Sequence, residues 1–137
     1  MSLKQKRKSN TTKKTRIEFN DLDYIFIAAN AANEKKGEDI LLLDVSKLTV
    51  ISDYFLIITA KSTPQIEAIS KYIEETLSKL NYKIISKEGF VGNSWTVLDF
   101  GNLVVHIMNE KERNYYKLEK FWSNATIIDK KKWEKAS

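Results

Sequence analysis

Two unbroken apolar runs constrain the fold of this 137-residue chain more than any other feature. Residues 40–45 read ILLLDV and residues 54–59 read YFLIIT, without the regular polar alternation of a half-exposed strand. A strand with this pattern needs cover on both of its faces. Apolar residues recur at helical spacing from residue 66 to residue 80, which predicts a helix that can provide such cover. The chain is therefore expected to form a sheet with helices packed on its faces.

The remaining pattern predicts eight elements in the order α β β α β β β α. The expected helices cover residues 21–35, 64–80 and 110–122, with caps at Asn20 or Asp21, at Thr63 and at Asn109. The expected strands cover residues 40–45, 54–59, 83–87, 95–100 and 103–108. The second and third strands flank a helix, which favours a parallel pair with a right-handed crossover. The fold class is α/β (α+β): a mixed five-stranded sheet flanked by helices.

Glycines mark two of the expected turns. Gly37 follows the first helix and is expected to end it at a positive φ. Gly101-Asn102 is expected to form a two-residue hairpin loop, which fixes the strand register. Counting outward from that loop pairs Phe100 with Leu103, Asp99 with Val104, Val97 with His106, and Trp95 with Met108. One face of the hairpin is therefore half polar, and the other is almost wholly apolar.

Positive charge is concentrated at the start of the chain. Residues 1–16 carry seven Lys and Arg and no acid, whereas the rest of the chain has 16 basic and 18 acidic residues. So few apolar residues predict a disordered basic tail at 1–17, followed by a folded domain at 18–123 and a C-terminal tail at 124–137. Clustered cations attract phosphate, so rRNA contact through the basic tail is one hypothesis and a merely solvated tail is the other.

Composition restricts the function classes. The chain has no cysteine, which excludes disulfides, thiolate metal ligands and a cysteine nucleophile. It has no run of about 18 apolar residues for a membrane-spanning helix, and its first residues lack the apolar segment of a secretory signal. We expect a cytoplasmic protein without membrane contact, and an organellar stroma or matrix is the alternative.

His106, the single histidine, is the first candidate for chemistry. Asp99 shares its face as a diagonal neighbour, about 7–8 Å away and beyond direct hydrogen-bond reach. A metal site needs three or four ligands, and the four glycines form no phosphate-binding loop. The favoured interpretation is a strand histidine hydrogen-bonded at the edge of a core, with no catalytic, cofactor-binding or metal-binding residue. The alternative is a nucleotidyltransferase-like enzyme, or a nucleotide- or RNA-binding domain, that uses Asp44, Asp99 and His106.

Three motifs in order resemble the ribosomal silencing factor family (RsfS, also called Iojap). They are Asp53-Tyr54, the W-x-x-L-D-x-G-x-x-V-V-H pattern from Trp95 to His106, and the Y-x-L-E-x-x-W pattern from Tyr116 to Trp122. The resemblance runs from about residue 21 to residue 122. Ser123-Asn124 departs from the family, which more usually has a glycine and an acid after this tryptophan.

The resemblance implies binding and not catalysis. It implies a fold related to nucleotidyltransferases but without their catalytic acids and glycine-serine loop. It also implies a translation repressor that binds the large ribosomal subunit through its ribosomal protein number fourteen. Such a protein blocks association with the small subunit when nutrients run low, and it requires no cofactor and is no enzyme.

The candidate partner-binding residues are Asp53, Tyr54, Trp95, Asp99, His106, Met108, Tyr116 and Glu119. Large apolar groups such as Trp95 and Met108 make good interface anchors, and the carboxylates suit a basic partner. Tyr116 and Glu119 are expected on the exposed flank of the last helix, whose buried stripe is Tyr115, Leu118, Phe121 and Trp122. The alternatives are core packing for Trp95 and Tyr54, a turn or cap role for Asp53, and bonds to turn amides for Asp99. The same face would also suit a homodimer of the free protein.

Overall fold

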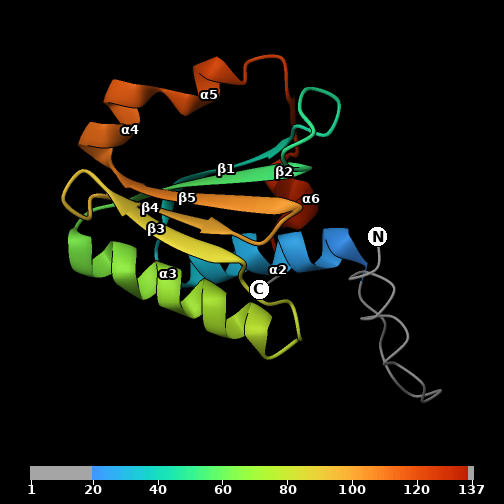
Figure 1. Ribbon diagram of the computed structural model, residues 1–137, viewed down its shortest axis with the longest axis horizontal. Helices are drawn as coiled ribbons and strands as arrows, with labels where there is room; N and C mark the ends of the chain where they lie inside the picture. The colour runs from blue at the N-terminus through green and yellow to red at the C-terminus, as the bar shows by residue number, and fades with distance from the viewer. Residues whose placement is uncertain (1–19, 136–137) are drawn as a thin grey trace.

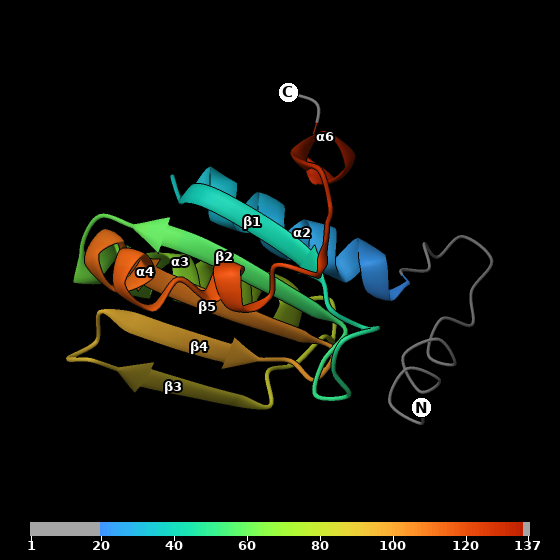
Figure 2. The ribbon, with the colours of Figure 1, turned by 90° about the horizontal axis from the view of Figure 1, so that it is seen from above.

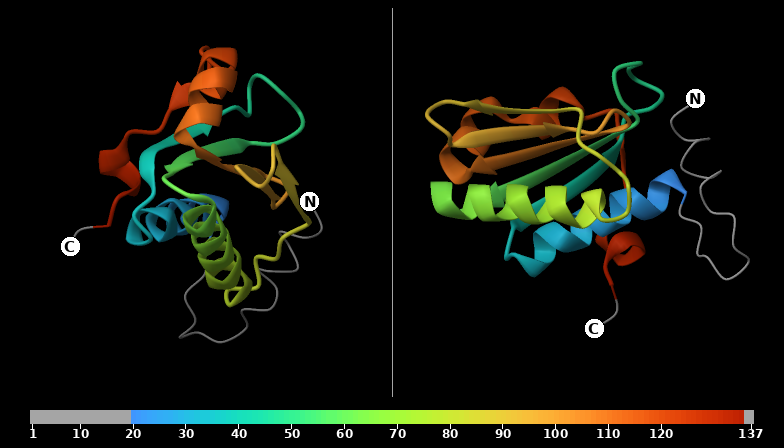
Figure 3. Two further views of the ribbon diagram at one scale, coloured as in Figure 1. Left: turned by 90° about the vertical axis from the view of Figure 1, so that its left-hand side faces the viewer. Right: turned by 60° about the horizontal axis from the view of Figure 1, so that its bottom comes forward.

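The computed structural model describes residues 20–135 as a mixed sheet with helices on both of its faces (Figure 1). The helices are α2 (Asp21–Glu34), α3 (Thr63–Ser78), α4 (Glu110–Tyr116), α5 (Leu118–Phe121) and α6 (Lys130–Trp133). The strands are β1 (Glu38–Asp44), β2 (Tyr54–Ala60), β3 (Ser86–Phe90), β4 (Trp95–Asp99), β5 (Leu103–Asn109) and β6 (Thr126–Ile127). We call the two faces the α2–α3 side and the α4–α5 side (Figure 3). The expected fold class is confirmed, while the expected tail at 1–17 lies outside the described residues.

The strand order is β3-β4-β5-β2-β1-β6 (Figure 2). The parallel neighbour of β2 is β5, in a register that pairs Ile57 with His106. The second and third strands run in the same direction, as expected, but they are not neighbours, because the β4–β5 hairpin lies between them. Strand β5 is apolar on both faces and suits the centre of the sheet, whereas all five residues of β3 are exposed and suit an edge.

The hairpin register expected from Gly101-Asn102 is confirmed. The pairs Asp99 with Val104 and Trp95 with Met108 lie directly opposite each other, and Gly101 has a φ of +94°. The third strand, in contrast, begins three residues later than expected, at Ser86. Its ladder with β4 continues to Phe90, so residues 88–90, expected to be a loop, are paired strand. The alternation of apolar residues is absent there, and the sequence pattern could not indicate the register.

Helix ends differ from expectation by single residues. Asn20 caps α2, since its side chain accepts from the Asp23 amide at 2.9 Å. Ser62, and not Thr63, caps α3 by accepting from the Gln65 amide at 3.2 Å. The positive φ after α2 belongs to Lys36, not to Gly37. Gly37 is needed for a close approach instead, because a Cβ there would lie 2.7 Å from Ile58 Cγ2.

The expected last helix is broken in two at Lys117. This residue has left-handed dihedral angles (φ 50°, ψ 54°), so α4 ends there and α5 starts in a new direction. The expected buried stripe is consequently half wrong. Leu118 and Trp122 pack on the sheet, but Tyr115 is 77% exposed and Phe121 is 84% exposed.

Residues 124–135, expected to be a tail, are part of the fold. Strand β6 pairs antiparallel with β1, which gives the sheet its sixth strand. Trp133 of α6 is only 3% exposed and lies in the main core. Asn30 holds this segment, since its Nδ2 donates to the Trp133 carbonyl at 2.6 Å and its Oδ1 accepts from the Lys135 amide at 2.8 Å. Trp133 is a buried core residue within a lysine-rich sequence, and the composition of that sequence does not indicate its burial.

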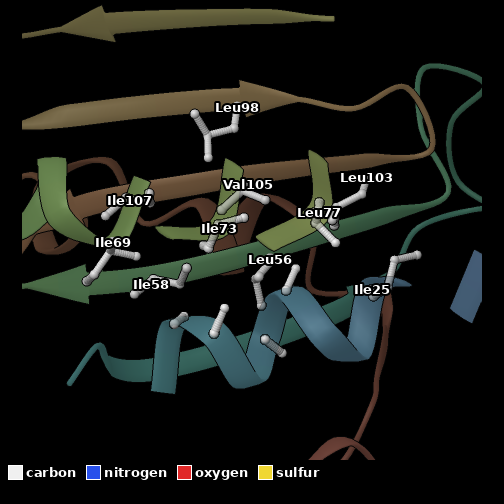
Figure 4. Packing of buried hydrophobic residues seen from close by; sticks show 14 of the residues in the cluster. Ile25, Leu56, Ile58, Ile69, Ile73, Leu77, Leu98, Leu103, Val105 and Ile107 are labelled. Atoms are coloured by element: carbon white, nitrogen blue, oxygen red, sulfur yellow. The ribbon is translucent and has the colours of Figure 1, made fainter. Parts of the chain in front are cut away.

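The main core lies between the sheet and the helices α2 and α3 (Figure 4). Side chains of the two helices pack against side chains of the strands. The helices contribute Ile25, Ile69, Ile73 and Leu77, and the strands contribute Leu56, Ile58, Leu98, Leu103, Val105 and Ile107. Full burial of such a side chain stabilises the fold by about 1.5–3 kcal/mol. A smaller cluster on the α4–α5 side contains Leu43, Val45, Phe55, Ile57, Val104 and Met108. Within residues 20–135, no helix is long and apolar enough to span a bilayer.

Candidate functional site: an aromatic array on the open side of the sheet

Among the described residues, eight aromatic rings are linked on the α4–α5 side. Trp95 is central, with centroids 5.6 Å from Phe90, 4.9 Å from Tyr116 and 5.9 Å from His106. The links continue from Tyr116 to Tyr115, and from His106 through Phe55 and Trp122 to Phe121. We call this set the aromatic array: Phe55, Phe90, Trp95, His106, Tyr115, Tyr116, Phe121 and Trp122.

Strand register and one helix cap bring these rings together. Phe90 lies directly opposite Trp95 in the β3–β4 ladder, so both rings project from the same face. Asn109 ends β5 and caps α4, with its side chain accepting from the Glu112 amide at 2.9 Å. The chain thereby turns back over the sheet, and α4 carries Tyr115 and Tyr116 to the rings of β3 and β4.

The array is only partly covered. Phe121 and Tyr115 are almost fully exposed, Tyr116 and Phe90 are exposed by 44% and 42%, and Trp95 is half-buried. Rings at this exposure, in contact with one another, form an apolar patch of the kind that often marks an interaction surface. Tyrosine and tryptophan supply much contact area with few rotatable bonds, which suits binding more than chemistry.

His106 lies within the array as a structural group. Its Nδ1 accepts a hydrogen bond from Trp95 Nε1 at 3.2 Å. Burial lowers the pKa of His106 to about 4, so the imidazole is neutral at neutral pH. The interpretation of a hydrogen-bonded strand histidine at the edge of a core is confirmed, and this histidine fixes the orientation of the Trp95 ring.

The candidate carboxylates Asp44 and Asp99 both close turns. Asp99 Oδ1 accepts from the Gly101 amide at 2.8 Å, as its alternative reading expected. Asp44 Oδ1 accepts from the Ser46 amide at 3.0 Å and from its hydroxyl at 2.6 Å. Within residues 20–135, no three His, Asp or Glu side chains gather as they would around a metal ion. Asp44 is on β1 and Asp99 is on β4, with β2 and β5 between them, so these two carboxylates do not form a pair for magnesium-dependent transfer.

Asp53 and Tyr54 lie apart from the aromatic array. The Asp53 carbonyl accepts from the Val45 amide at 2.8 Å, and its amide donates to the Asn102 carbonyl at 3.3 Å. These bonds join the loop before β2 to the hairpin turn. Tyr54 is partly buried and packs against the main core on the α2–α3 side. The structure thus does not bring this pair together with Trp95 and Tyr116.

Met108 and Glu119 support the array from beneath and from its edge. Met108 has no exposed surface, so it offers no contact area to a partner in this conformation. Glu119 Oε2 accepts from Arg113 Nε at 3.4 Å. The buried Arg113 also donates through Nη1 to the Asp39 carbonyl at 2.5 Å and to Thr59 Oγ1 at 2.9 Å. This guanidinium fastens α4 and α5 to strands β1 and β2.

Three exposed rings of the array were absent from the expected set. Phe90 was assigned to a loop, and Tyr115 and Phe121 were assigned to a buried stripe. The cross-strand partner of Phe90 depends on where β3 begins, which its exposed sequence does not indicate. Tyr115 and Phe121 are freed by the break at Lys117, and lysine is not a residue that usually takes this conformation.

Comparison with known proteins gives the chain a family. A family model described as "Ribosomal silencing factor during starvation" matches residues 19–137. The chain is 37% identical over 111 residues to "Ribosomal silencing factor RsfS" of Bacillus subtilis, covering 81% of this chain and 94% of that protein. It is 42% identical over 108 residues to "Protein Iojap, chloroplastic" of Zea mays, covering 79% of this chain and 47% of that longer protein.

A solved structure agrees with this result. A crystal structure of a Chromobacterium violaceum protein superposes with a TM-score of 0.73 at 30% identity, covering 77% of this chain and 88% of that one. The resemblance carried by the three sequence motifs is thereby confirmed. The mixed sheet, the matched family model and these relatives lead to one conclusion: the chain belongs to the ribosomal silencing factor family.

Proposed function

We propose that this chain binds the large ribosomal subunit through its aromatic array and thereby blocks association with the small subunit. The docking partner in this proposal is ribosomal protein number fourteen of the large subunit, and the outcome is repression of translation. The relatives support the regulatory role by their name, "Ribosomal silencing factor RsfS". A protein that acts by occupying a surface needs no reacting group, which agrees with the structural roles of His106, Asp44 and Asp99.

The observation that carries the proposal is the exposure of four rings of the aromatic array, which lies on the sheet. Phe90, Tyr115, Tyr116 and Phe121 are all more than 40% exposed. An aromatic side chain can bury about 150–250 Å², and a standard interface buries about 800 Å² on each partner. These rings can therefore supply a large part of one interface. The sheet beneath and the Arg113 bonds hold them in place before binding, which lowers the entropic cost of association.

Charge adds a second, weaker argument. Residues 20–128 contain 12 basic and 15 acidic side chains. Glu88 lies opposite Val97 on the same face as Trp95, and Glu110 is exposed at the start of α4. Carboxylates around an apolar patch favour a basic partner, mainly through the association rate and the orientation of docking.

Sucrose-gradient sedimentation of purified ribosomal subunits tests this function. A molar excess of the protein should reduce the joined-ribosome peak, and the double substitution Tyr115→Ser/Phe121→Ser should restore it. Both side chains are mostly exposed, so we expect the free energy of unfolding to change by less than about 0.5 kcal/mol.

Ile85→Ser is the matched control for this experiment. Ile85 is 68% exposed, and its side chain lies outside the aromatic array, against the Gly101 turn. This substitution also removes exposed apolar area and should leave the activity intact. The proposal fails if the unaltered protein leaves the joined-ribosome peak unchanged.

A further inference from the structure

The C-terminal helix α6 is a rigidly held turn that presents lysines. Trp133 is buried in the main core, and Asn30 binds both the Trp133 carbonyl and the Lys135 amide. On the other flank the Ile128 amide donates to the Leu42 carbonyl at 2.9 Å, and Asp129 caps the turn. Lys130, Lys131 and Lys132 are all exposed on this fixed backbone, as is Lys135 beyond it. We call these four residues the lysine cluster.

Most of these ammonium groups have no carboxylate partner. Lys130 pairs with Glu134 at 3.6 Å. Among the described residues, no carboxylate oxygen lies within 4.0 Å of the ammonium of Lys131, Lys132 or Lys135.

The net charge around the lysine cluster is opposite in sign to the net charge of residues 20–128. Residues 20–128 have three more acidic than basic side chains, whereas residues 129–135 have four lysines and two acids. The positive potential is therefore local to one edge, beyond β1 and β6 (Figure 2). This edge is the one opposite β3, and α6 lies clear of α4 (Figure 3).

We propose that the lysine cluster on α6 binds the phosphate backbone of RNA. Closely spaced ammonium groups without carboxylate partners suit successive phosphates, and their binding releases counterions without reading the base sequence. An acidic protein is the less suitable occupant. The turn itself exposes no apolar side chain, since Trp133 faces the core, and protein interfaces draw most of their affinity from such anchors.

This inference rests on the proposed function in one respect: the RNA would be the rRNA of the large subunit to which the array docks. The cluster would then give a second contact, sideways from the array. Two contacts on one particle raise the overall affinity beyond that of either alone, if the geometry lets both engage.

The test measures binding of the full chain to a fluorescently labelled RNA hairpin by anisotropy at several salt concentrations. The variant is Lys130→Gln/Lys131→Gln/Lys132→Gln. Each lost phosphate contact reduces the slope of log K against log [salt] by about 0.7–0.9. We expect the slope to fall by about two in the variant, and the affinity at about 0.1 M salt to fall roughly a hundredfold.

A matched control separates the cluster from net charge. Lys71→Gln/Lys79→Gln/Lys83→Gln removes the same formal charge from exposed positions on α3 and in the segment after it, where Glu74 and Glu75 lie between Lys71 and Lys79. We expect this control to keep the slope of the unaltered protein. An unchanged slope in the α6 variant, or an equal loss in both variants, would overturn the proposal. Displacement of the labelled RNA by polyglutamate as readily as by unlabelled RNA would overturn the assignment to RNA.

The hairpin contains no ribosomal protein, so the two proposals fail separately. Tyr115→Ser/Phe121→Ser should bind the hairpin as tightly as the unaltered chain, even where it no longer affects subunit joining. Normal binding of the hairpin with no effect on subunit joining contradicts only the proposed function. Block of subunit joining by a chain whose hairpin affinity does not depend on α6 contradicts only this inference.

Discussion

The two sides of the sheet differ in how completely their apolar surface is covered. On the α2–α3 side two long helices close the core, and Ile73, Leu77 and Leu98 have no exposed surface. On the α4–α5 side two short helices cross part of the sheet and leave Trp95 and Val97 half-buried (Figure 1). The first side buries most of the apolar core, and the second leaves part of its apolar surface exposed.

The difference lies in what holds the helices in place. α2 and α3 are held by apolar side chains in a continuous core. α4 and α5 depend more on polar contacts, chiefly the bonds from Arg113 to Asp39, Thr59 and Glu119. A buried guanidinium is costly unless each bond is made, so these bonds fix one position of α4 with little apolar burial. Rings on α4 and α5 thus remain exposed without being loosely attached.

The largest expected effect tests this contrast with one side chain type on both sides. Leu98→Ala should lower the free energy of unfolding by about 3–4 kcal/mol, because it leaves a cavity in the closed core. Leu118→Ala should cost only about 1 kcal/mol, because Leu118, the first residue of α5, is already partly exposed. Urea denaturation followed by circular dichroism measures both values. Equal losses would contradict the division between a stabilising side and a binding side.

The α2–α3 side could be predicted from the sequence, because its elements are indicated by patterns among residues that are close together in the chain. Helical spacing over residues 66–80 and the two-residue turn at Gly101-Asn102 each indicate which side chains face the core. The pairing of β2 with β5 and the addition of β6 depend on contacts between distant segments. A strand of exposed residues such as β3, or a lysine-rich segment with one buried tryptophan, carries no periodic pattern.

The open side was predictable only in part. Trp95, His106 and Tyr116 were candidate partner-binding residues, and the structure places all three in the array. Met108 shares their strand face, yet it is buried under the α4–α5 segment. Phe121 and Tyr115 were expected to be buried, because an uninterrupted helical period was extended through Lys117. Strand alternation indicates the face of a residue, but only the path of the covering segment decides its exposure.

A smaller effect concerns the pH dependence of the array. The folded-state pKa of His106 is about 4, below its usual value of 6.5, because burial disfavours the charged imidazole. Between these two values the unfolded chain binds the proton and the folded chain does not. The contribution of His106 to the free energy of unfolding is therefore complete above pH 6.5 and is lost as pH falls towards 4, by about 3 kcal/mol.

His106→Gln isolates this contribution. Urea denaturation at intervals between pH 4 and pH 7 should show that the difference in unfolding free energy between the two proteins changes by about 3 kcal/mol. Protonation would also break the bond from Trp95 Nε1, so tryptophan fluorescence should change over the same range. Parallel pH profiles for the two proteins would contradict this prediction, because they would mean that His106 has the same pKa in the folded and the unfolded chain.

The smallest effect concerns the break that exposes Tyr115 and Phe121. Lys117 adopts a left-handed conformation that disfavours a side chain with a Cβ. Lys117→Gly should relieve this strain and raise the free energy of unfolding by about 0.5 kcal/mol, net of the greater chain entropy of glycine. Lys120→Gly, a control within α5, should lower it by about 0.5–1 kcal/mol. If both substitutions destabilise equally, the αL residue is not what divides α4 from α5, and the exposure of the two rings requires another cause.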